Sequence, residues 1–196
     1  SKHRMKFFFL ILKNILYAKK IFSKPIKTKI LFYDDAGTDL IKKKINKKNY
    51  QTMYIRGESI NIIILLKTLL NFGVNFRSYT HEYIKYVKPK IVITCIDNNL
   101  FFYTLKKNFP EIIFISIQNG YRTKYRDFFI KLKKLKNEKK LGNLQADYIF
   151  LFGKNFMLEY LKYIKFKPIL LGSYRNNCVP INKTKEIDKS ILFISQ

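Results

Sequence analysis

The sequence has no tryptophan and few of the residues that build metal sites and disulfide frameworks. Its 196 residues include 7 Gly, 2 His and 2 Cys. The histidines, His3 and His81, are far apart, and the cysteines, Cys95 and Cys178, form no CxxC pair. Zinc sites and disulfide scaffolds need such residues at close, repeated spacings, so a metal site is not expected. Cys95 lies in an apolar run and is expected to be a small core residue rather than a nucleophile.

The sequence also lacks the glycine-rich and nucleophile motifs of several enzyme classes. It contains no GxxxxGK[ST], GxGxxG or GxSxG stretch, which argues against nucleoside triphosphatases, dinucleotide enzymes and acyl transfer. The stretch DDAGTD invites comparison with the haloacid-dehalogenase phosphatases, in which an acid follows the nucleophilic Asp two residues later. Asp34 would be that nucleophile, but Ala36 stands in place of the acid. A turn between a strand and a helix is therefore the favoured interpretation.

Acidic residues are scarce relative to basic ones. The chain has 39 Lys and Arg against 13 Asp and Glu, a formal net charge of +26. Such a surface attracts the phosphates of nucleotide-sugars, nucleic acid or anionic lipids. The residue palette is also typical of an AT-rich coding sequence, in which case much of the lysine only covers solvated faces. Nucleic-acid binding is the less favoured alternative, because the aromatic residues of YRTKYRDFFIKLKKLKNEKK recur at helical core spacing.

What is present is a regular alternation of apolar strands and amphipathic helices. Strands are predicted at residues 29–33, 50–55, 90–96, 112–117, 146–153 and 167–173. Helices are predicted at residues 59–72, 79–86, 128–140 and 155–164, and another begins at Asp97 or Asn98 as its cap and stops before Pro110. This pattern predicts an α/β fold with a doubly wound, parallel, Rossmann-like sheet.

The chain divides into four predicted segments. Residues 1–26 form a basic amphipathic helix, with Phe8, Leu12 and Ile15 on its apolar face. Its apolar run is too short to span a membrane, so it either lies at a membrane surface or docks on the next domain. Residues 27–177 form the Rossmann-like domain and residues 178–189 a linker. Residues 190–196 begin a strand, which we expect to be the first strand of a truncated second domain.

Polar residues gather where the predicted strands end. Parallel α/β sheets bind ligands beyond these ends, so the binding candidates are Asp34, Arg56, Asn98, Gln118, Asn119, Gly120, Arg122, Arg175, Asn176 and Asn177. Asp97 is the candidate catalytic base, because a carboxylate at a strand end could accept the proton of an attacking hydroxyl. Helix capping is the alternative role of Asp97. Glu58 is the alternate base.

Several stretches resemble the N-terminal half of bacterial surface-carbohydrate biosynthesis proteins, which are glycosyltransferases of the two-domain GT-B type acting on polysaccharide and O-antigen. They read VKPKIVITCIDNNLFFYTLKKNFPEIIFISIQNGYR, ADYIFLFG, ILLGSYRNN and ILFISQ. More distantly, the layout is similar to that of CDP-glycerol glycerophosphotransferases. Asn119 stands where those enzymes carry histidine, so a histidine base is not transferred to this position. The Gln-Asn-Gly at residues 118–120 fits the carbohydrate family better.

The resemblance implies the acceptor-side half of a glycosyltransferase, which holds a glycan or lipid-linked acceptor. No cofactor is implied; a nucleotide-sugar would be the donor substrate, bound by a C-terminal domain that we expect to lie outside this chain. The implied location is cytoplasmic, peripheral at the inner face of the cytoplasmic membrane, where an anionic surface is a further expected partner. A glycan- or membrane-binding module without catalytic activity remains the alternative function.

Overall fold

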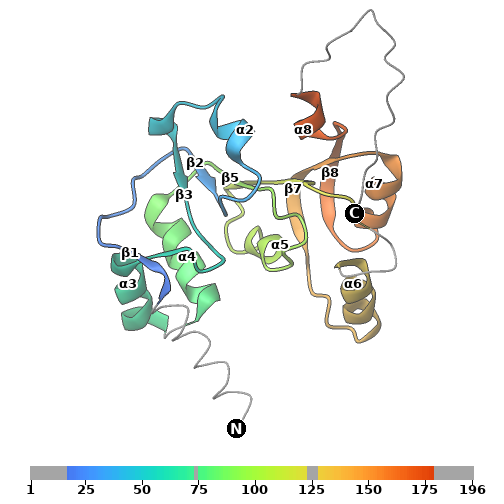
Figure 1. The fold of residues 1–196 in the computed structure, drawn as a ribbon. Helices are drawn as coiled ribbons and strands as arrows, with labels where there is room; N and C mark the ends of the chain where they lie inside the picture. Colours follow the sequence, from blue (N-terminus) through green and yellow to red (C-terminus); the bar gives the residue numbers. More distant parts are fainter. Residues whose placement is uncertain (1–16, 73–74, 123–127, 179–196) are drawn as a thin grey trace, which may run out of the picture.

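The computed structural model describes residues 17–72, 75–122 and 128–178, which form an α/β fold around one large parallel sheet (Figure 1). Six strands lie in the order β3-β2-β5-β6-β7-β8, and every pair is parallel. This arrangement confirms the predicted Rossmann-like sheet. The strands are β2 (Ile30–Phe32), β3 (Tyr50–Thr52), β5 (Ile91–Thr94), β6 (Ile113–Ile117), β7 (Gln145–Leu151) and β8 (Lys165–Leu170).

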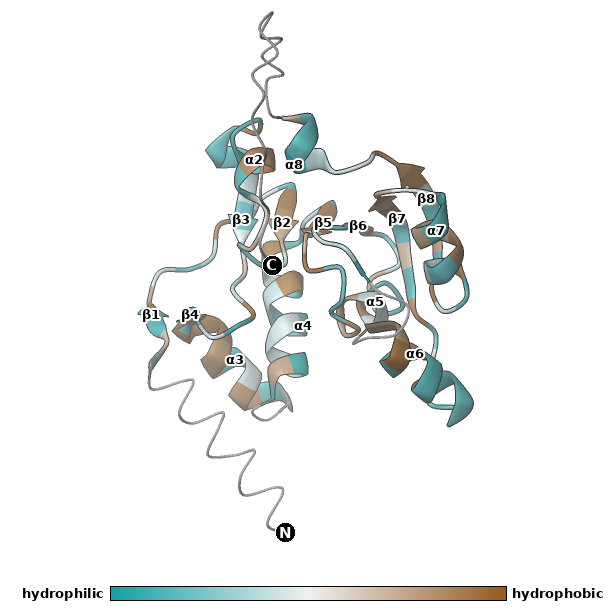
Figure 2. Cartoon of the chain, turned by 45° about the vertical axis from the view of Figure 1, so that its right-hand side comes forward, coloured by the Kyte–Doolittle hydropathy of each residue, from teal (hydrophilic) through white to brown (hydrophobic). Residues whose placement is uncertain are grey.

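Helices follow these strands along the chain and lie in two groups, toward opposite ends of the molecule. Figures 1 and 2 both show α2 and α8 at one end of the molecule, with α4, α5 and α6 toward the other. Most helices are close to their predicted positions. They are α2 (Asp39–Lys42), α3 (Ile62–Phe72), α4 (Phe76–Val87), α5 (Phe102–Leu105), α6 (Phe128–Asn137), α7 (Lys154–Leu161) and α8 (Tyr174–Asn177), with a 3-10 turn at Lys47–Asn49.

The strand order reverses between β2 and β5. From β2 the chain first adds β3 on one side, and then places all later strands of the sheet on the other side, beginning with β5. Ile30 of β2 lies opposite Tyr50 of β3 and Ile91 of β5. Crevices at the carboxyl ends of strands that flank such a reversal are where open parallel sheets bind ligands.

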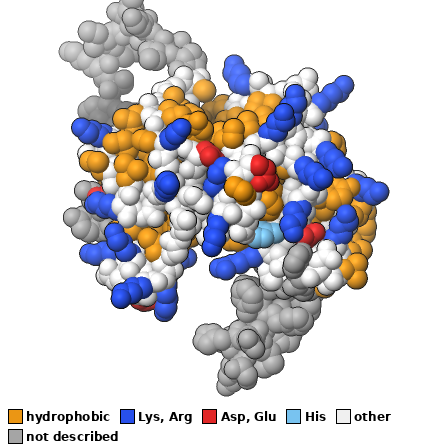
Figure 3. Space-filling model, turned by 180° about the vertical axis from the view of Figure 1, so that it is seen from behind, with side chains coloured by type: hydrophobic (Ala, Val, Ile, Leu, Met, Phe, Trp, Pro, Cys, Tyr) orange, Lys and Arg blue, Asp and Glu red, His pale blue; other side chains and the backbone are white. Residues whose placement is uncertain are grey.

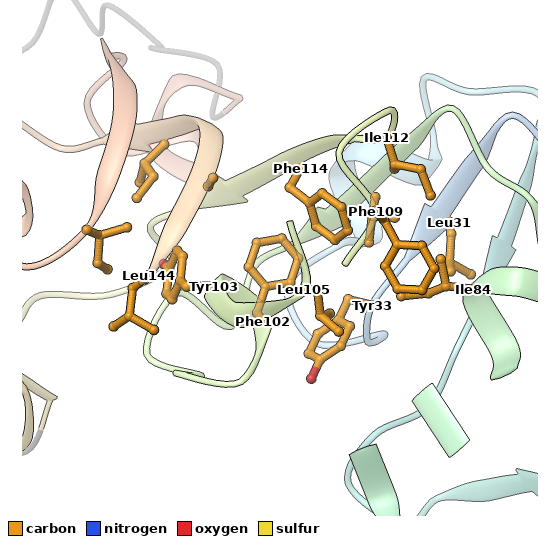
Figure 4. Packing of buried hydrophobic residues seen from close by; sticks show 14 of the residues in the cluster. Leu31, Tyr33, Ile84, Phe102, Tyr103, Leu105, Phe109, Ile112, Phe114 and Leu144 are labelled. Atoms are coloured by element: carbon orange, nitrogen blue, oxygen red, sulfur yellow. The ribbon is translucent and has the colours of Figure 1, made fainter. Parts of the chain in front are cut away.

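Aromatic side chains fill the core between α5 and the central strands. Phe102 and Tyr103 of α5 and Phe114 of β6 are fully buried (Figure 4). The rings of Phe102 and Phe114 meet edge to face, with centroids 5.6 Å apart. Leu31 of β2 and Ile84 of α4 belong to the same cluster. The central strands read as nearly continuous apolar runs because the sheet interior has to fill this core.

Two predictions at the start of the chain are corrected by a small second sheet. Residues 59–61 are not the first turn of a helix but strand β4 (Ser59–Asn61), which pairs in parallel with β1 (Lys19–Ile21). The predicted N-terminal helix therefore does not extend through residue 26. Asn61 explains the boundary, because its side-chain oxygen accepts a hydrogen bond from the Ile64 amide at 3.1 Å and caps α3.

The predicted helix cap at Asp97 or Asn98 is also wrong. Helix α5 begins at Phe102 with Phe101 as its N-cap, and Asp97 directs its carboxylate elsewhere. The predictions for residues 1–16 and 179–196, including most of the linker and the strand of a second domain, lie outside the described residues. None of the helices within residues 17–72, 75–122 and 128–178 has the length and hydrophobicity to cross a membrane.

Candidate functional site

Four segments meet at the carboxyl ends of β2 and β5. We call this group the switch-point cluster: Gly37, Asp39, Cys95, Asn119, Tyr174 and Arg175. Gly37 and Asp39 follow β2, Cys95 follows β5, Asn119 follows β6, and the last two residues come from α8. The cluster therefore joins parts of the chain up to 137 residues apart, through the hydrogen bond that the Tyr174 hydroxyl donates to the Gly37 carbonyl oxygen.

Gly37 makes this convergence possible in two ways. Its φ angle is +73°, a left-handed conformation that favours glycine. A Cβ atom at this position would lie 2.8 Å from Asn119 Nδ2 and 3.0 Å from the Cβ of Cys95. The turn after β2 thus needs both the backbone freedom and the missing side chain of glycine to let Asn119 approach.

Asn119 is the centre of the polar contacts in the switch-point cluster. Its side-chain oxygen accepts a hydrogen bond from Arg175 Nε at 3.2 Å and lies 3.3 Å from the Tyr174 hydroxyl. Arg175 in turn donates to the Asp39 carboxylate at 2.7 Å. The side chains of Arg175 and Asp39 are 43% and 54% exposed, so both groups can exchange this pairing for a ligand. An amide, a guanidinium and a carboxylate at one surface suit sugar hydroxyls or a phosphate.

A buried ion pair lies directly behind Asn119. The Asp97 side chain is wholly inaccessible, and both of its oxygens accept from Arg122, at 2.7 and 2.9 Å. The Tyr160 hydroxyl donates to the same carboxylate at 2.5 Å, and the Asn119 backbone amide lies 3.4 Å away. This carboxylate therefore ties the ends of β5 and β6 to α7 and fixes the backbone from which Asn119 projects.

Tyr160 and Arg122 keep their protons in this network and act as donors. Burial first, and then the charge of Asp97, raise the pKa of Tyr160, so this phenol keeps its proton and acts as a donor. The hydrogen bonds to Asp97 likewise raise the pKa of Arg122. With all these donors in place, the geometry favours a positioning role for Asp97 over direct proton transfer from a substrate.

Asp34 belongs to a separate cluster, which joins the ends of β2 and β3. Its carboxylate is buried and accepts from the backbone amides of Ala36 at 2.8 Å and Ile55 at 3.2 Å. Arg56 binds the same carboxylate at 2.9 Å and also contacts Glu58 at 2.9 Å. The turn interpretation of DDAGTD is confirmed, because Asp34 satisfies the backbone of two strand ends. Glu58 is half exposed and faces solvent with Arg56 as its partner.

The other predicted binding residues are not brought together. Gln118 is buried, and its side chain accepts from the Phe152 amide at 2.9 Å and donates to the Gly120 carbonyl at 2.9 Å. This residue therefore holds β6 to the end of β7 and shapes the corner. The Asn176 backbone amide donates to the hydroxyl of Ser173, which caps α8, and the Asn177 side chain donates to the Leu171 carbonyl. Asn98 lines a different cavity.

Sequence reasoning missed Gly37, Asp39, Tyr174 and Tyr160. Two of these residues had a signal in the sequence: Tyr174 stands next to Arg175, and Gly37 is the only glycine of the turn after β2. The pairing of Tyr174 with Gly37 is long-range and carries no sequence signal. Cys95 is confirmed as a core residue, because it is 2% exposed and burial raises the pKa of its thiol to about 12.

Within the described ranges, no three His, Cys, Asp or Glu side chains are arranged to hold a metal ion. Residues 114–196 match a protein family described as "putative O-antigen biosynthesis protein". This match relates the second part of the chain, including Asn119, Tyr174 and Arg175, to O-antigen biosynthesis. No curated protein and no solved structure matches the chain.

Proposed function

We propose that the chain acts in the biosynthesis of a surface polysaccharide, as the acceptor-binding half of a glycosyltransferase of the GT-B type. The observation that carries this proposal is the switch-point cluster. Its half-buried Asn119 and exposed Arg175 lie at the strand ends where open parallel sheets take ligands. Both residues fall inside the segment related to O-antigen biosynthesis.

In this proposal the cluster orients a sugar of the acceptor. The Asn119 amide and the Asp39 carboxylate bind sugar hydroxyls, and Arg175 meets a hydroxyl or a phosphate. The acceptor hydroxyl attacks the anomeric carbon of a nucleotide-sugar, the bond to the nucleotide phosphate breaks, and a base takes the hydroxyl proton. The donor is bound by a separate domain. Asp97 takes the proton only if Arg122 moves away from it, and Glu58 is the other candidate.

A glycan-binding module without catalytic activity is the second candidate function. The observation that favours it is that the carboxylates near the strand ends are paired with arginines and are not free to act as a base. This holds for Asp34, Asp39, Asp97 and Glu58. Asp97→Asn and Glu58→Gln separate the two candidates when transfer and binding are both measured. In an enzyme, substitution of the base abolishes glycosyl transfer. In a binding module there is no transfer to lose: Glu58→Gln leaves glycan binding unchanged, and Asp97→Asn alters only the binding, through the backbone that carries Asn119.

Association with an anionic membrane stays a proposal that two surface features support. Helix α3 is mostly apolar (Figure 2), yet its Leu66, Leu69 and Leu70 are 54%, 45% and 86% exposed. Lys and Arg side chains are spread over the molecular face seen in Figure 3, with few acidic ones between them. Exposed leucines and lysines together suit a peripheral position on anionic lipid. Co-sedimentation with anionic and neutral vesicles checks this, and equal binding to both would contradict it.

Deletion of the gene in the source organism tests the role in polysaccharide synthesis. We expect the deletion to shorten or remove the O-antigen ladder on a gel. The wild-type gene should restore the ladder, whereas the Asn119→Ala, Arg175→Ala double variant should not, because the acceptor loses two of its proposed contacts. Asn143→Ala, an exposed substitution away from the strand ends, serves as the control that restores the ladder. A normal ladder in the deletion strain would overturn the proposal.

A further inference from the structure

A second feature that could bind a ligand is a cavity beside α5 and α6, outside the switch-point cluster. Between α5 and α6 the structure contains a cavity of about 650 Å³, a size typical of ligand sites. Figures 1 and 2 place these helices away from α2 and α8, which carry part of the switch-point cluster. The cavity is lined by Arg77, Ile96, Asn98, Asn99, Leu100, Phe101, Thr104, Lys131, Leu135, Lys140, Leu141 and Leu144.

One part of this lining is apolar. Half of the lining residues are hydrophobic, and they come from the β5–α5 turn, from α6 and from the segment that leads into β7. They are Ile96, Leu100, Phe101, Leu135, Leu141 and Leu144. An apolar portion of a ligand would gain about 25 cal/mol for each square ångström that it removes from water here.

The charged part of the lining is entirely basic. Arg77, Lys131 and Lys140 contribute positive charge, and no lining residue is acidic. The guanidinium of Arg77 lies over the Phe101 ring, 5.6 Å from its centroid, which holds it at the cavity wall. Among the ion pairs of the described residues, neither Arg77 nor Lys131 has a carboxylate partner; Lys140 pairs with Glu138 at 3.1 Å. Arg77 of α4 and Lys131 of α6 are thus available to an anion.

Neutral polar groups complete the site. The exposed Asn98 amide lines the cavity, and Thr104 lies on α5 beside it. Asn99 uses its side-chain oxygen to accept from the Phe101 amide at 3.0 Å, which fixes the turn that carries Phe101 and Asn98. Such groups orient a phosphate that the cations attract.

We propose that the cavity between α5 and α6 binds an anionic amphiphile, a phosphate monoester that carries an apolar chain. The phosphate lies against Arg77 and Lys131, and the chain lies on the leucines. The ligand needs both parts, because a free phosphate would leave the apolar lining in contact with water and a neutral lipid would leave the cations without a counter-charge. This site is independent of the sugar-binding proposal, so each can fail without the other.

A calorimetric titration of the full chain with monooctyl phosphate tests the proposal. We expect saturable binding at one site. Arg77→Gln and Lys131→Gln should each weaken it about tenfold, the loss expected for one charge-assisted hydrogen bond of ~1.4 kcal/mol. Lys133→Gln is the matched control, because Lys133 is an exposed lysine of α6 outside the cavity lining and should leave the affinity unchanged. All three side chains are exposed, so the variants should fold, which circular dichroism verifies.

Three results would overturn the proposal. Equal weakening by Lys133→Gln would mean that only the net charge attracts the ligand. Equally tight binding of octyl glucoside would mean that the cations do not recognise the phosphate. Equally tight binding of inorganic phosphate would mean that the apolar wall is unused. Because none of these probes is a polysaccharide acceptor, the outcome leaves the sugar-binding proposal untouched.

Discussion

Replacing Arg122 by methionine is expected to lower the free energy of unfolding by about 3–5 kcal/mol, the usual loss when one partner of a buried ion pair is removed. The Asp97 side chain is wholly inaccessible and has both oxygens bound by Arg122, so the variant leaves a buried carboxylate without its counter-charge. Tyr160 alone cannot compensate for that charge. Urea unfolding followed by circular dichroism measures the loss.

A second substitution separates loss of the ion pair from loss of packing. Adding Asp97→Asn to Arg122→Met should restore part of the stability, because the buried unpaired charge is removed; coupling of about 0.5–3 kcal/mol is typical of such contacts. Lys134→Met is the control, since Lys134 is 74% exposed beside Glu138 and exposed pairs contribute less than about 1 kcal/mol. If Arg122→Met costs no more than Lys134→Met, the carboxylate is reached by water and the proposed positioning role is wrong.

Gly37→Ala is expected to destabilise the protein by about 2–4 kcal/mol. The left-handed φ of +73° disfavours alanine by about 1 kcal/mol. The new methyl group would also displace Asn119 or Cys95, and such overpacking adds about 1–3 kcal/mol. Because Asn119 is pushed from its place, sugar binding should weaken together with stability. The same unfolding experiment, with a binding titration, measures both effects.

Gly142→Ala is the matched control for Gly37→Ala. Gly142 has a similar φ of +67°, but a Cβ atom there would meet nothing within 4 Å. This variant carries only the backbone strain, so the difference between the two variants isolates the clash with the switch-point cluster. Equal losses in the two variants would show that the β2 turn has room for a side chain and that Asn119 does not depend on it.

The parallel sheet could be predicted because its central strands have a clear sequence signal. Runs such as IVIT and IFISI are continuous and apolar, and only a sheet covered on its faces needs such strands. The position of the binding residues at the strand ends then followed from topology. Both β1 and β4 escaped prediction, because their residues, KKI and SIN, form no apolar run or alternation that signals a strand. Asn61 sets their boundary through hydrogen bonds that no spacing rule reveals.

Within the candidate site, residue types were easier to predict than partners. Asn119 and Arg175 were found because amides and guanidinium groups after apolar strands are conspicuous. Arg122 faces inward to Asp97 and not outward to a ligand, and the same carboxylate is bound by Tyr160, 63 residues further along the chain. Long-range pairings of this kind decide which polar residue is structural and which is exposed. Gln118 is another example, since its amide completes the backbone bonding of β7 rather than a ligand site.

The most direct test of the switch-point cluster is amide NMR of the full chain during titration with oligosaccharides from the O-polysaccharide of the source organism. We predict saturable shifts at Gly37, Asn119 and Arg175, and none at Gly142 or along α6. We also predict that Asn119→Ala, Arg175→Ala abolishes them. Saturable shifts confined to other residues, or no shifts at concentrations that saturate a weak sugar site, would contradict the assignment of this cluster as the acceptor site.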